Sequence, residues 1–594
     1  MTVLAELGDR RRAPWQACAR RWQTRILTST LLALLVACGN PAGSGSEGNS
    51  QPVGPTRNEA SRFLAQASFG ATDAEIDRVV VMGYRGWIDD QFVRAPRLHR
   101  PYLDARSATL APQGIRISED DFIESFWNSA VSGEDQLRQR MAFALSQIFV
   151  VSFVDGALFE HVRGIGSYYD MLTAHAFGNF RGLLKDVALH PMMGIYLSSI
   201  QNQKEGPGRV PDENFAREVM QLFSIGLFEL NTDGSLKRDA AGMAIETYGP
   251  ADVGGLARVF TGWSWYAGPD TGSRDNAHYF GTVVHPDSDW QPMQPYTQAG
   301  ADYHSTSEKR FLGRTIPATG TAAPEADLDA AIDTLFLHPN VGPFIGRLLI
   351  QRLVTSNPSP AYIGRVATAF ADNGAGVRGD LRAVLRAILL DPEAREVAAD
   401  DTRSGKLREP VLRLAHFFRA FRSTSGSGRW VGIDNTDDPS TALGQTPMRA
   451  PSVFNFFRPD YAPNQPELAA AAMVAPELQI VSEVSVAGYL NYMQGRLAAD
   501  VVRDVRQDFG PEKVLARTPD RLAAHLDTLL TGGRMSPLLR QRLVQAVESR
   551  AVPAPVLNSD GQTTNSSAID AALRDRVAIA VMLTMASPDY LVQR

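Results

Sequence analysis

Apolar residues recur with the period of an α-helix in segments spread along most of this chain. Residues three, four and seven positions apart fall on one face of a helix, and such a face has to be buried against other elements. The strongest segments lie within residues 137–149, 215–223, 343–354, 381–389 and 569–585. We therefore predict a mainly α fold, an irregular multi-helix body with a small β or loop insertion in its middle.

Two long segments lack this helical period. Residues 267–326 are rich in Gly, Pro, Asp and Tyr, with short alternating pieces at 278–280 and 309–316 that indicate a small strand pair or ordered loops. Residues 423–464 are a second irregular loop region, rich in Gly, Ser and Pro. A loop that is long for a compact protein is usually functional or an insertion. We assign both segments to a single body that spans residues 58–594.

The N-terminal region has the three parts of a bacterial lipoprotein signal. Six arginines and two acids precede an apolar run at residues 26–37, which is too short to span a bilayer as a stable helix. The run ends in LVACG at residues 35–39, which resembles the lipobox cut by lipoprotein signal peptidase. We predict a signal peptide over residues 1–37, lipid on Cys38 and a flexible Gly- and Ser-rich tether over residues 38–57. The alternative is an uncleaved membrane anchor.

Cysteine content and charge limit the functional classes. Of the two cysteines, Cys18 lies in the predicted signal, so Cys38 is the only one left for the mature chain. We therefore expect no internal disulfide, no thiolate metal site and no cysteine nucleophile. Gly39, rather than an aspartate, follows Cys38 and favours the outer membrane. The net charge of −6 and the lack of a basic tract after the signal argue against nucleic acid as a partner.

A stripe of polar residues at residues 213–221 holds the candidate catalytic groups. Asn214, Arg217, Glu218 and Gln221 follow one another at helical spacing beside an apolar face, and Glu213 falls in the first helical turn. Glu218 has the chemistry of a general acid or base, and Arg217 that of an anchor for an anionic group. The alternative is a structural network of salt bridges, with Glu213 paired to Arg217.

The histidines of the irregular middle are the candidate metal ligands. His278, His285 and His304 lie in one segment with Asp287 and Asp289, and imidazole with carboxylate suits zinc or another divalent cation. Their spacing matches no established metal motif, so a hydrophilic turn is the alternative. We predict no cofactor, with a divalent metal as the competing hypothesis.

Charged and aromatic side chains in unusual places are further candidates. Four arginines lie on helices that are otherwise apolar: Arg138, Arg140, Arg347 and Arg352. Each buried guanidinium needs a carboxylate, a cluster of carbonyls or a ligand. In the second irregular region, the aromatics that follow Arg449 either stack on sugars or fill the core. No glycine-rich phosphate loop or Gly-x-Ser-x-Gly elbow appears in its required context, which argues against nucleotide-dependent and ordinary serine-hydrolase chemistry.

Eight segments occur in an order that is itself informative. They are RFLAQASFG at 62–70, RQRMAFALSQ at 138–147, ENFARE at 213–218, FTGW at 260–263, KRFLG at 309–313, HPNVGPFI at 338–345, KLREP at 406–410 and RAPSVFNF at 449–456. Together they resemble the bacterial family called domain of unknown function 1800, over residues 58–594. The resemblance implies secretion and a largely helical body, and it carries no established reaction. His304-Ser305 departs from the family pattern, in which a His-Asp pair often stands at this place.

The resemblance also implies a partner. Genes of this family often lie beside those of domain of unknown function 1501, an exported family similar to sulfatases and alkaline phosphatases. We therefore expect an accessory or presenting lipoprotein of the cell envelope that serves such a sulfatase-like partner in handling an extracellular polymer. The alternative is a hydrolase acting on polysaccharide, with Glu218 and Arg217 at its centre and a metal at His278, His285 or His304.

Overall fold

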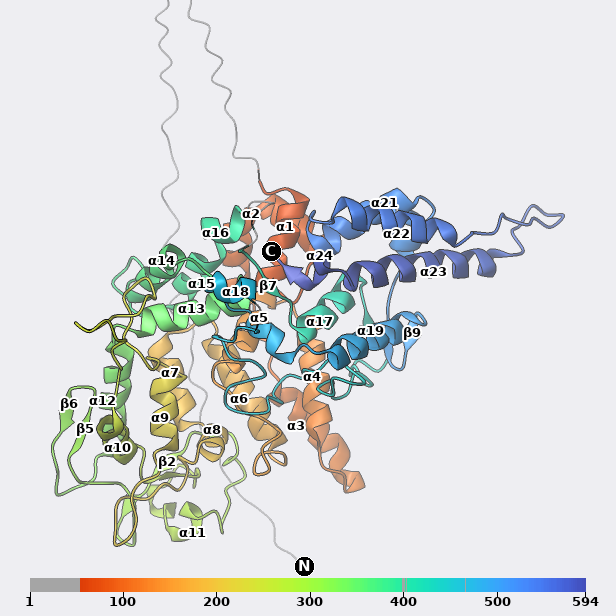
Figure 1. The fold of residues 1–594 in the computed structure, drawn as a ribbon. Helices are drawn as coiled ribbons and strands as arrows, with labels where there is room; N and C mark the ends of the chain where they lie inside the picture. The colour runs from red at the N-terminus through yellow and green to blue at the C-terminus, as the bar shows by residue number, and fades with distance from the viewer. Residues whose placement is uncertain (1–53, 398–400, 402, 465) are drawn as a thin grey trace, which may run out of the picture. The chain divides into compact units, whose positions relative to one another are not determined.

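The computed structural model describes residues 54–594, except 398–400, 402 and 465. Helices dominate this part of the chain and the strands are short, which confirms the predicted mainly α fold (Figure 1). The predicted signal peptide, Cys38 and most of the tether lie outside the described residues. Within the described residues, no helix combines the length and the apolar character needed to cross a membrane.

From residue 54 onward, ten α-helices precede the irregular middle of the chain. They are α1 (Arg57–Ala67), α2 (Asp73–Val93), α3 (Arg100–Leu110), α4 (Glu119–Ser132), α5 (Gln136–Ser146), α6 (Val162–His175), α7 (Phe180–Leu189), α8 (Pro191–Tyr196), α9 (Asn214–Gln221) and α10 (Pro250–Val259). The next helices are α11 (Asn276–Tyr279), α12 (Pro324–Leu337), α13 (Val341–Leu353), α14 (Pro360–Ala371), α15 (Leu381–Leu389), α16 (Pro392–Arg395) and α17 (Pro410–Ala420). The C-terminal helices are α18 (Pro466–Ala470), α19 (Glu483–Leu497), α20 (Gly510–Leu515), α21 (Pro519–Leu526), α22 (Pro537–Ser549), α23 (Ser566–Met585) and α24 (Pro588–Leu591).

Tighter and wider helical turns and short strands complete the fold. The 3₁₀ turns are η1 (Ala111–Gln113), η2 (Thr271–Ser273) and η3 (Pro476–Ile480), and η4 (Asp527–Thr531) is a π-helical turn. The strands are β1 (Trp263–Ser264), β2 (Gln294–Pro295), β3 (Thr297–Gln298), β4 (Ala301–Asp302), β5 (Lys309–Phe311), β6 (Arg314–Ile316), β7 (Lys406–Leu407), β8 (Thr424–Ser425), β9 (Val501–Val502), β10 (Val505–Arg506) and β11 (Val592–Gln593). They pair antiparallel as β1-β2, β3-β4, β5-β6, β7-β11 and β8-β10-β9.

The helical faces predicted from the apolar period are buried in one large core. In α15, Leu381, Val384, Leu385, Ile388 and Leu389 are all fully buried. Each such side chain contributes about 1.5–3 kcal/mol when it leaves water. The other predicted helices appear as α5, α9, α13 and α23. The helical period therefore located these core elements correctly.

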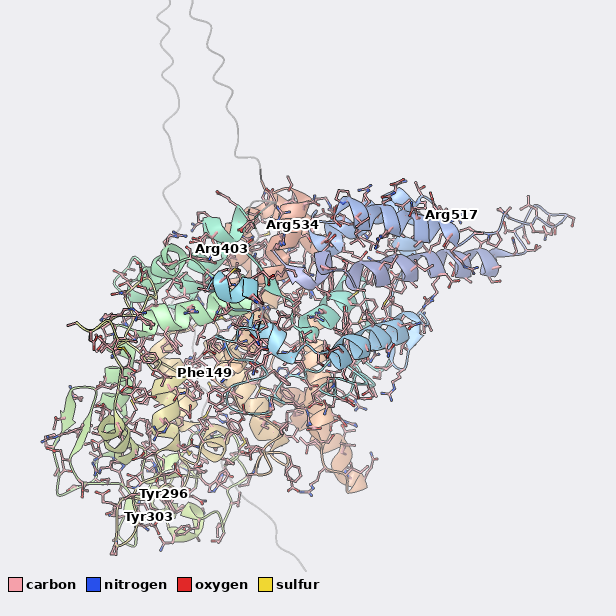
Figure 2. The ribbon with its side chains drawn as sticks, in the orientation of Figure 1. Phe149, Tyr296, Tyr303, Arg403, Arg517 and Arg534 are labelled. Carbon is pink, nitrogen blue, oxygen red and sulfur yellow. The ribbon has the colours of Figure 1, made fainter. Side chains whose placement is uncertain are left out.

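Residues 267–326 contain the short strands and ordered loops that were predicted, with one error. Residues 309–316 form the hairpin β5-β6, and a small apolar cluster of Ala267, Tyr279, Tyr296 and Ala301 lies apart from the main core. Tyr303 stacks on Tyr279 with ring centroids 3.9 Å apart, and Figure 2 shows Tyr296 and Tyr303 together at this end of the molecule.

The error concerns the alternating piece at residues 278–280. It is not a strand, because the Asp275 side chain accepts a hydrogen bond from the amide of His278 and starts the short helix α11.

Five charged residues, three of them from two of the eight motifs, meet in the interior in what we call the polar centre: Arg140, Arg352, Lys406, Glu409 and Glu477. All five are at least nine-tenths buried. Lys406 Nζ lies 3.5 Å from a Glu409 oxygen and 3.0 Å from a Glu477 oxygen. An Arg140 Nη2 hydrogen donates to the Arg352 carbonyl oxygen at 2.5 Å. Arg140 therefore has a backbone carbonyl as its partner, and the Arg352 guanidinium carbon lies 4.5 Å from the centroid of the Phe457 ring, so within the described residues neither arginine forms the predicted ion pair.

Candidate functional site

An open cleft of about 920 Å³ lies between helical ends in the N-terminal half of the body. The turn that follows η1, the first turn of α4, residues 153–161 and the start of α6 supply most of its lining. Ligand pockets in proteins typically enclose about 300–1,000 Å³, so the cleft can take several units of a polymer. We refer to it below as the cleft.

Both irregular regions reach the cleft. Asp289 comes from residues 267–326 and Arg449 from residues 423–464, and both line it. Gly164 in α6 permits the first of these contacts, because a Cβ atom there would lie 2.8 Å from the Asp289 carbonyl oxygen and 2.5 Å from the sulfur of Met192. Two segments that sequence reasoning marked as insertions or functional loops thus meet helices α4 and α6 at one concave surface.

The apolar part of the lining is exposed to solvent. Ile115, Val154 and Phe159 are 51%, 50% and 54% exposed. Nearby, the ring of His161 stacks on Trp265 with centroids 6.1 Å apart and an interplanar angle of 28°. Exposed apolar side chains gathered at one concave surface mark a binding site more often than single exposed residues do. The flat ring of Phe159 suits the ring face of a carbohydrate.

The titratable groups of the cleft centre on Asp289 and His161. Burial raises the pKa of Asp289, and the positive charges of Arg100 and Arg163 oppose this only in part. One carboxylate oxygen of Asp289 is buried without a hydrogen-bond partner. Burial lowers the pKa of His161, against the charges of Asp289 and Glu160. Both shifts favour the neutral forms of the two groups, and a carboxyl near an imidazole is an arrangement that enzymes use for proton transfer.

The cations that line the cleft all have acidic partners. Arg449 pairs with Glu119 at 2.5 Å and with Asp437 at 2.8 Å. Arg163 Nε donates to Asp104 at 2.7 Å, and Arg116 lies 3.6 Å from Glu160. Since each guanidinium is already neutralised, the cleft favours a neutral ligand over a polyanion.

The polar stripe on α9 is divided between solvent and the interior. Glu213 is the N-cap residue and pairs with Arg217 at 3.3 Å, and both side chains are 47% exposed. Asn214 is exposed, whereas Glu218 is 8% exposed. Burial raises the pKa of Glu218, and one of its carboxylate oxygens has no hydrogen-bond partner. The four residues therefore do not face one common space, and none of them lines the cleft.

The three candidate histidines lie in three different environments. His304 is fully buried, and its ring nitrogens contact the Thr261 carbonyl oxygen at 2.7 Å and Asp327 at 3.0 Å. His278 Nδ1 contacts Asp275 at 2.8 Å, and the His285 ring packs edge-on against Tyr266. Within residues 54–594, with the gaps given above, no three His, Cys, Asp or Glu side chains are grouped so that they could hold a metal ion.

A family model described as a protein of unknown function (DUF1800) matches residues 62–592, nearly all of the described chain. The chain belongs to the DUF1800 family. Comparison with curated proteins and with solved structures gave no match. The matched region contains both irregular segments, the polar centre and the whole cleft.

The structure gives a reason why this DUF1800 protein can have serine at position 305. Asp327, from α12, supplies a carboxylate to His304 and also pairs with Lys309 at 2.8 Å. Burial alone would raise the pKa of Asp327, but hydrogen bonds from His304 and Lys309 lower it overall. Ser305 Oγ instead donates to Glu205 at 2.9 Å. His304 is thus held by a carboxylate that does not come from the neighbouring position.

Sequence reasoning missed several residues of the cleft. Phe159 and His161 lie in a short connection that carries no motif, and Ile115 is a single apolar residue in a turn. The one signal available was that both long irregular segments contain residues suited to binding, Asp289 and Arg449. Their meeting at α4 and α6 depends on tertiary packing, which no local pattern encodes.

Proposed function

We propose that this DUF1800 protein is an exported lipoprotein, anchored by lipid on Cys38 in the outer membrane, that binds a segment of an extracellular polymer in the cleft. The cleft carries the proposal, because it combines an open shape, exposed apolar faces and neutralised charges. These features suit an extended, largely neutral chain such as a polysaccharide. The arginine-rich start, apolar run and lipobox-like sequence support export and lipidation.

The proposed role is accessory: the protein presents the polymer to a secreted enzyme. The family resemblance supports a sulfatase- or phosphatase-like partner of the domain of unknown function 1501 family, by analogy, and such an enzyme would act on ester groups outside the uncharged segment that the cleft holds. A tether over residues 38–57 would hold the body away from the membrane and leave the cleft open to both polymer and enzyme.

Replacing Phe159 by alanine is expected to weaken polysaccharide binding at least tenfold. The substitution removes an aromatic face worth about 1.5–3 kcal/mol when covered, and about 1.4 kcal/mol corresponds to a factor of ten in affinity. The measurement is retention of the purified protein on an array of neutral and sulfated glycans, followed by titration of the best ligand using tryptophan fluorescence. Trp265, stacked on His161, is the expected reporter.

Phe454→Ala is the matched control, since Phe454 is 44% exposed and does not line the cleft. It should bind as the unchanged protein does. A protein that binds no glycan, or that binds equally well with either substitution, would contradict the proposal. Capture of envelope proteins by the lipidated chain tests the accessory role separately, and recovery of no sulfatase-like protein would count against it.

One observation favours a hydrolase as the second candidate: Asp289, with its raised pKa and unpartnered oxygen, lies beside His161 in the cleft. In this version Asp289 is the general acid for glycosidic cleavage, rather than Glu218. Asp289→Asn should then lower polysaccharide hydrolysis by about 10²–10⁴-fold. Activity should also fall as the pH rises through the pKa of Asp289, because the acid must be protonated.

Glu218→Gln is the control that separates the two sites, because Glu218 also has a raised pKa but lies on α9. Loss of hydrolysis with Glu218→Gln but not with Asp289→Asn would move the reaction to α9. Release of reducing ends, followed between pH 4 and 9, is the readout. Equal activity of all three proteins would exclude both carboxylates.

A further inference from the structure

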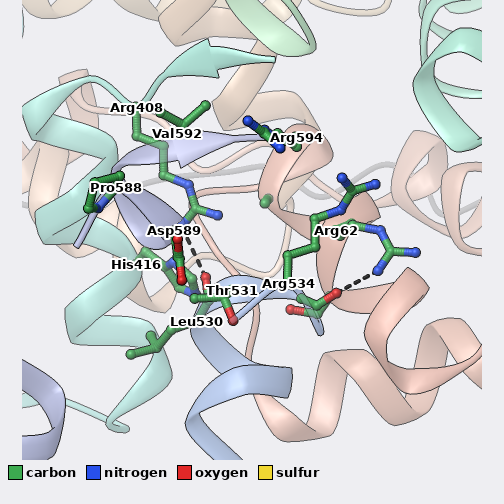
Figure 3. A pocket seen from close by; sticks show the side chains of 13 residues that line it. Arg62, Arg408, His416, Leu530, Thr531, Arg534, Pro588, Asp589, Val592 and Arg594 are labelled. Atoms are coloured by element: carbon green, nitrogen blue, oxygen red, sulfur yellow. Dashed lines mark hydrogen bonds between the residues drawn. The ribbon is translucent and has the colours of Figure 1, made fainter. Parts of the chain in front are cut away.

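A second cavity, of about 130 Å³, is lined by arginines from distant parts of the chain. We call it the arginine pocket, and its charged residues are Arg62, Arg408, Arg534, Arg594 and Asp589 (Figure 3). Arg62 comes from α1, Arg408 follows β7, and Arg534 follows η4. Asp589 belongs to α24, and Arg594 follows β11. None of these residues lines the cleft.

Backbone geometry brings these residues together. β11 pairs with β7, which places the segment after α24 beside Arg408. Gly532 has φ 62°, and a Cβ atom there would lie 2.5 Å from the side chain of Arg62. Arg62 instead donates to the Gly532 carbonyl oxygen at 2.5 Å. The adjoining turn η4 is π-helical, a distortion that is common at functional sites.

Within the described part of the chain, the four arginines of the pocket lack an acidic partner, unlike the arginines that line the cleft. Among residues 54–594, apart from the gaps, no Asp or Glu oxygen lies within 4.0 Å of the guanidinium nitrogens of Arg62, Arg408, Arg534 or Arg594. Asp589, the acid in the lining, accepts a hydrogen bond from the Ser536 amide at 2.7 Å. Burial and the charges of Arg62 and Arg594 lower the pKa of Arg534. The pocket thus gathers four guanidinium groups and one carboxylate, which leaves positive charge in excess.

Arg408 is the most constrained of the four. Its side chain is 7% exposed and stacks over Tyr590, with the guanidinium carbon 4.6 Å from the ring centroid. One terminal nitrogen contacts His416 at 3.2 Å and the Leu530 carbonyl oxygen at 3.3 Å, while Nε is buried without a partner. Burial lowers the pKa of His416 well below its usual value, so the imidazole is neutral and accepts from Arg408. A buried guanidinium with no carboxylate is costly unless an anion pairs with it.

We propose that the arginine pocket binds a tetrahedral oxyanion, a phosphate or sulfate group. The cavity has room for several water molecules or one such group. Arginine forks match the oxygens of phosphate and sulfate through paired N–H donors, whereas a carboxylate fills fewer of them. Arg408 provides the fixed donor at the base. Arg62 and Arg534, which are partly exposed, and Arg594, which is exposed, close over the group.

The phosphate group can come from a free ion or from a phospholipid. Arg62 lies in the second turn of α1, near the start of the described residues. If the proposed lipid on Cys38 anchors the chain, a flexible tether would let the body approach headgroups as well as extend away from the membrane. The binding chemistry is the same for both sources, and it does not depend on the cleft.

Isothermal titration of the full-length protein with sodium phosphate and with sodium sulfate tests the pocket at low ionic strength, where charge screening is weakest. We expect saturable binding of either ion, and no comparable heat from sodium chloride. Arg534→Gln should weaken binding at least about tenfold, since it removes a charge-assisted donor. Arg517→Gln is the matched control, because Arg517 is exposed and lies well away from Arg534 (Figure 2).

Asp589→Asn distinguishes anion binding from a purely structural role of the arginines. Removing the acid of the pocket should tighten phosphate binding several-fold, while Arg534→Gln loosens it. Absence of binding to both ions at millimolar concentration would overturn the proposal. So would equal affinities for the Arg534→Gln and Arg517→Gln proteins, provided that both keep the thermal unfolding midpoint of the unchanged protein.

Vesicles separate the two sources of phosphate. We compare sedimentation of the protein with phosphatidylglycerol vesicles and with phosphatidylcholine vesicles, with and without added inorganic phosphate. Binding to phosphatidylglycerol that Arg534→Gln weakens and phosphate competes away supports a headgroup. Saturable phosphate binding without vesicle binding supports a free oxyanion. Both results support the site, and failure of both the vesicle and ion experiments rejects it without bearing on polymer binding in the cleft.

Discussion

Replacing Glu409 by glutamine is expected to destabilise the folded body by about 3–5 kcal/mol, the usual result of breaking a buried ion pair from one side. Glu409 is fully buried in the polar centre, where Lys406, Arg140 and Arg352 surround it. Gln445 donates to one of its oxygens at 2.8 Å, and Gln147 donates to the same oxygen. Glutamine keeps the shape of the side chain but removes its negative charge. Glu477 is then the acidic residue left in the polar centre to balance the buried cations.

The pH dependence of stability gives this prediction a second readout. Burial alone would raise the pKa of Glu409, but the charges of Lys406, Arg140 and Arg352 hold it below its usual value of 4.5. A lowered folded-state pKa gives stability that is present above the unfolded-state pKa and is lost as the pH falls through the folded-state value. The unchanged protein should therefore lose stability below about pH 4.5, and the Glu409→Gln protein should lose less of it there.

Urea unfolding followed by circular dichroism measures both effects. Glu213→Gln is the matched control, because it makes the same change in an ion pair that is 47% exposed. Its cost should not exceed about 1 kcal/mol. Similar unfolding midpoints for the two variants would show that the polar centre does not hold the helices together.

Gly255→Ala is expected to have an effect of similar size through packing rather than charge. A Cβ atom at Gly255 in α10 would lie 1.7 Å from the carbonyl oxygen of Arg310 in β5. The added methyl group can be accommodated only if the helix moves away from the hairpin. Overpacking typically costs about 1–3 kcal/mol, and we expect Gly255→Ala to lower the free energy of unfolding by about 3 kcal/mol or more. The hairpin that should detach carries Lys309, which pairs with Asp327.

Gly495→Ala is the control for this change. Gly495 is an exposed position in α19, with no atom within 4 Å of an added Cβ. Alanine there should be neutral or stabilise the protein by about 0.4–1 kcal/mol. Thermal unfolding compares the two variants, and limited proteolysis should cut the Gly255→Ala protein within residues 267–326. Equal stability of both would show that the contact between α10 and β5 relaxes without cost.

The sequence predicted those parts of the fold that depend on local patterns. The apolar period of residues 381–389 fixes which side of α15 is buried, and the hairpin at residues 309–316 follows from alternation. The α9 stripe shows where such reasoning ends. Spacing places Asn214 and Glu218 on one side of a helix, but what covers each depends on neighbouring elements, so one is exposed and the other buried.

The sites were less predictable because they join distant segments. Arg62 and Arg408 both belong to motifs by which the family was recognised, yet neither motif indicates that the two side chains share a cavity. That contact requires the pairing of β7 with β11 and the turn at Gly532. In the same way, Phe159, Asp289 and Arg449 acquire a common role only in the folded cleft.

The pairing of β11 with β7 also bears on when the protein can fold. Gln593 donates to the carbonyl oxygen of Leu353, a residue 240 positions earlier, so β11 fastens segments that leave the ribosome long before it does. Contacts that close so large a loop form late and slowly. Until β11 has been synthesised, β7 has no strand partner and the carbonyl oxygen of Leu353 at the end of α13 lacks its hydrogen bond from Gln593. Under the export that we propose, this late pairing would give the chain time to cross the membrane before it folds.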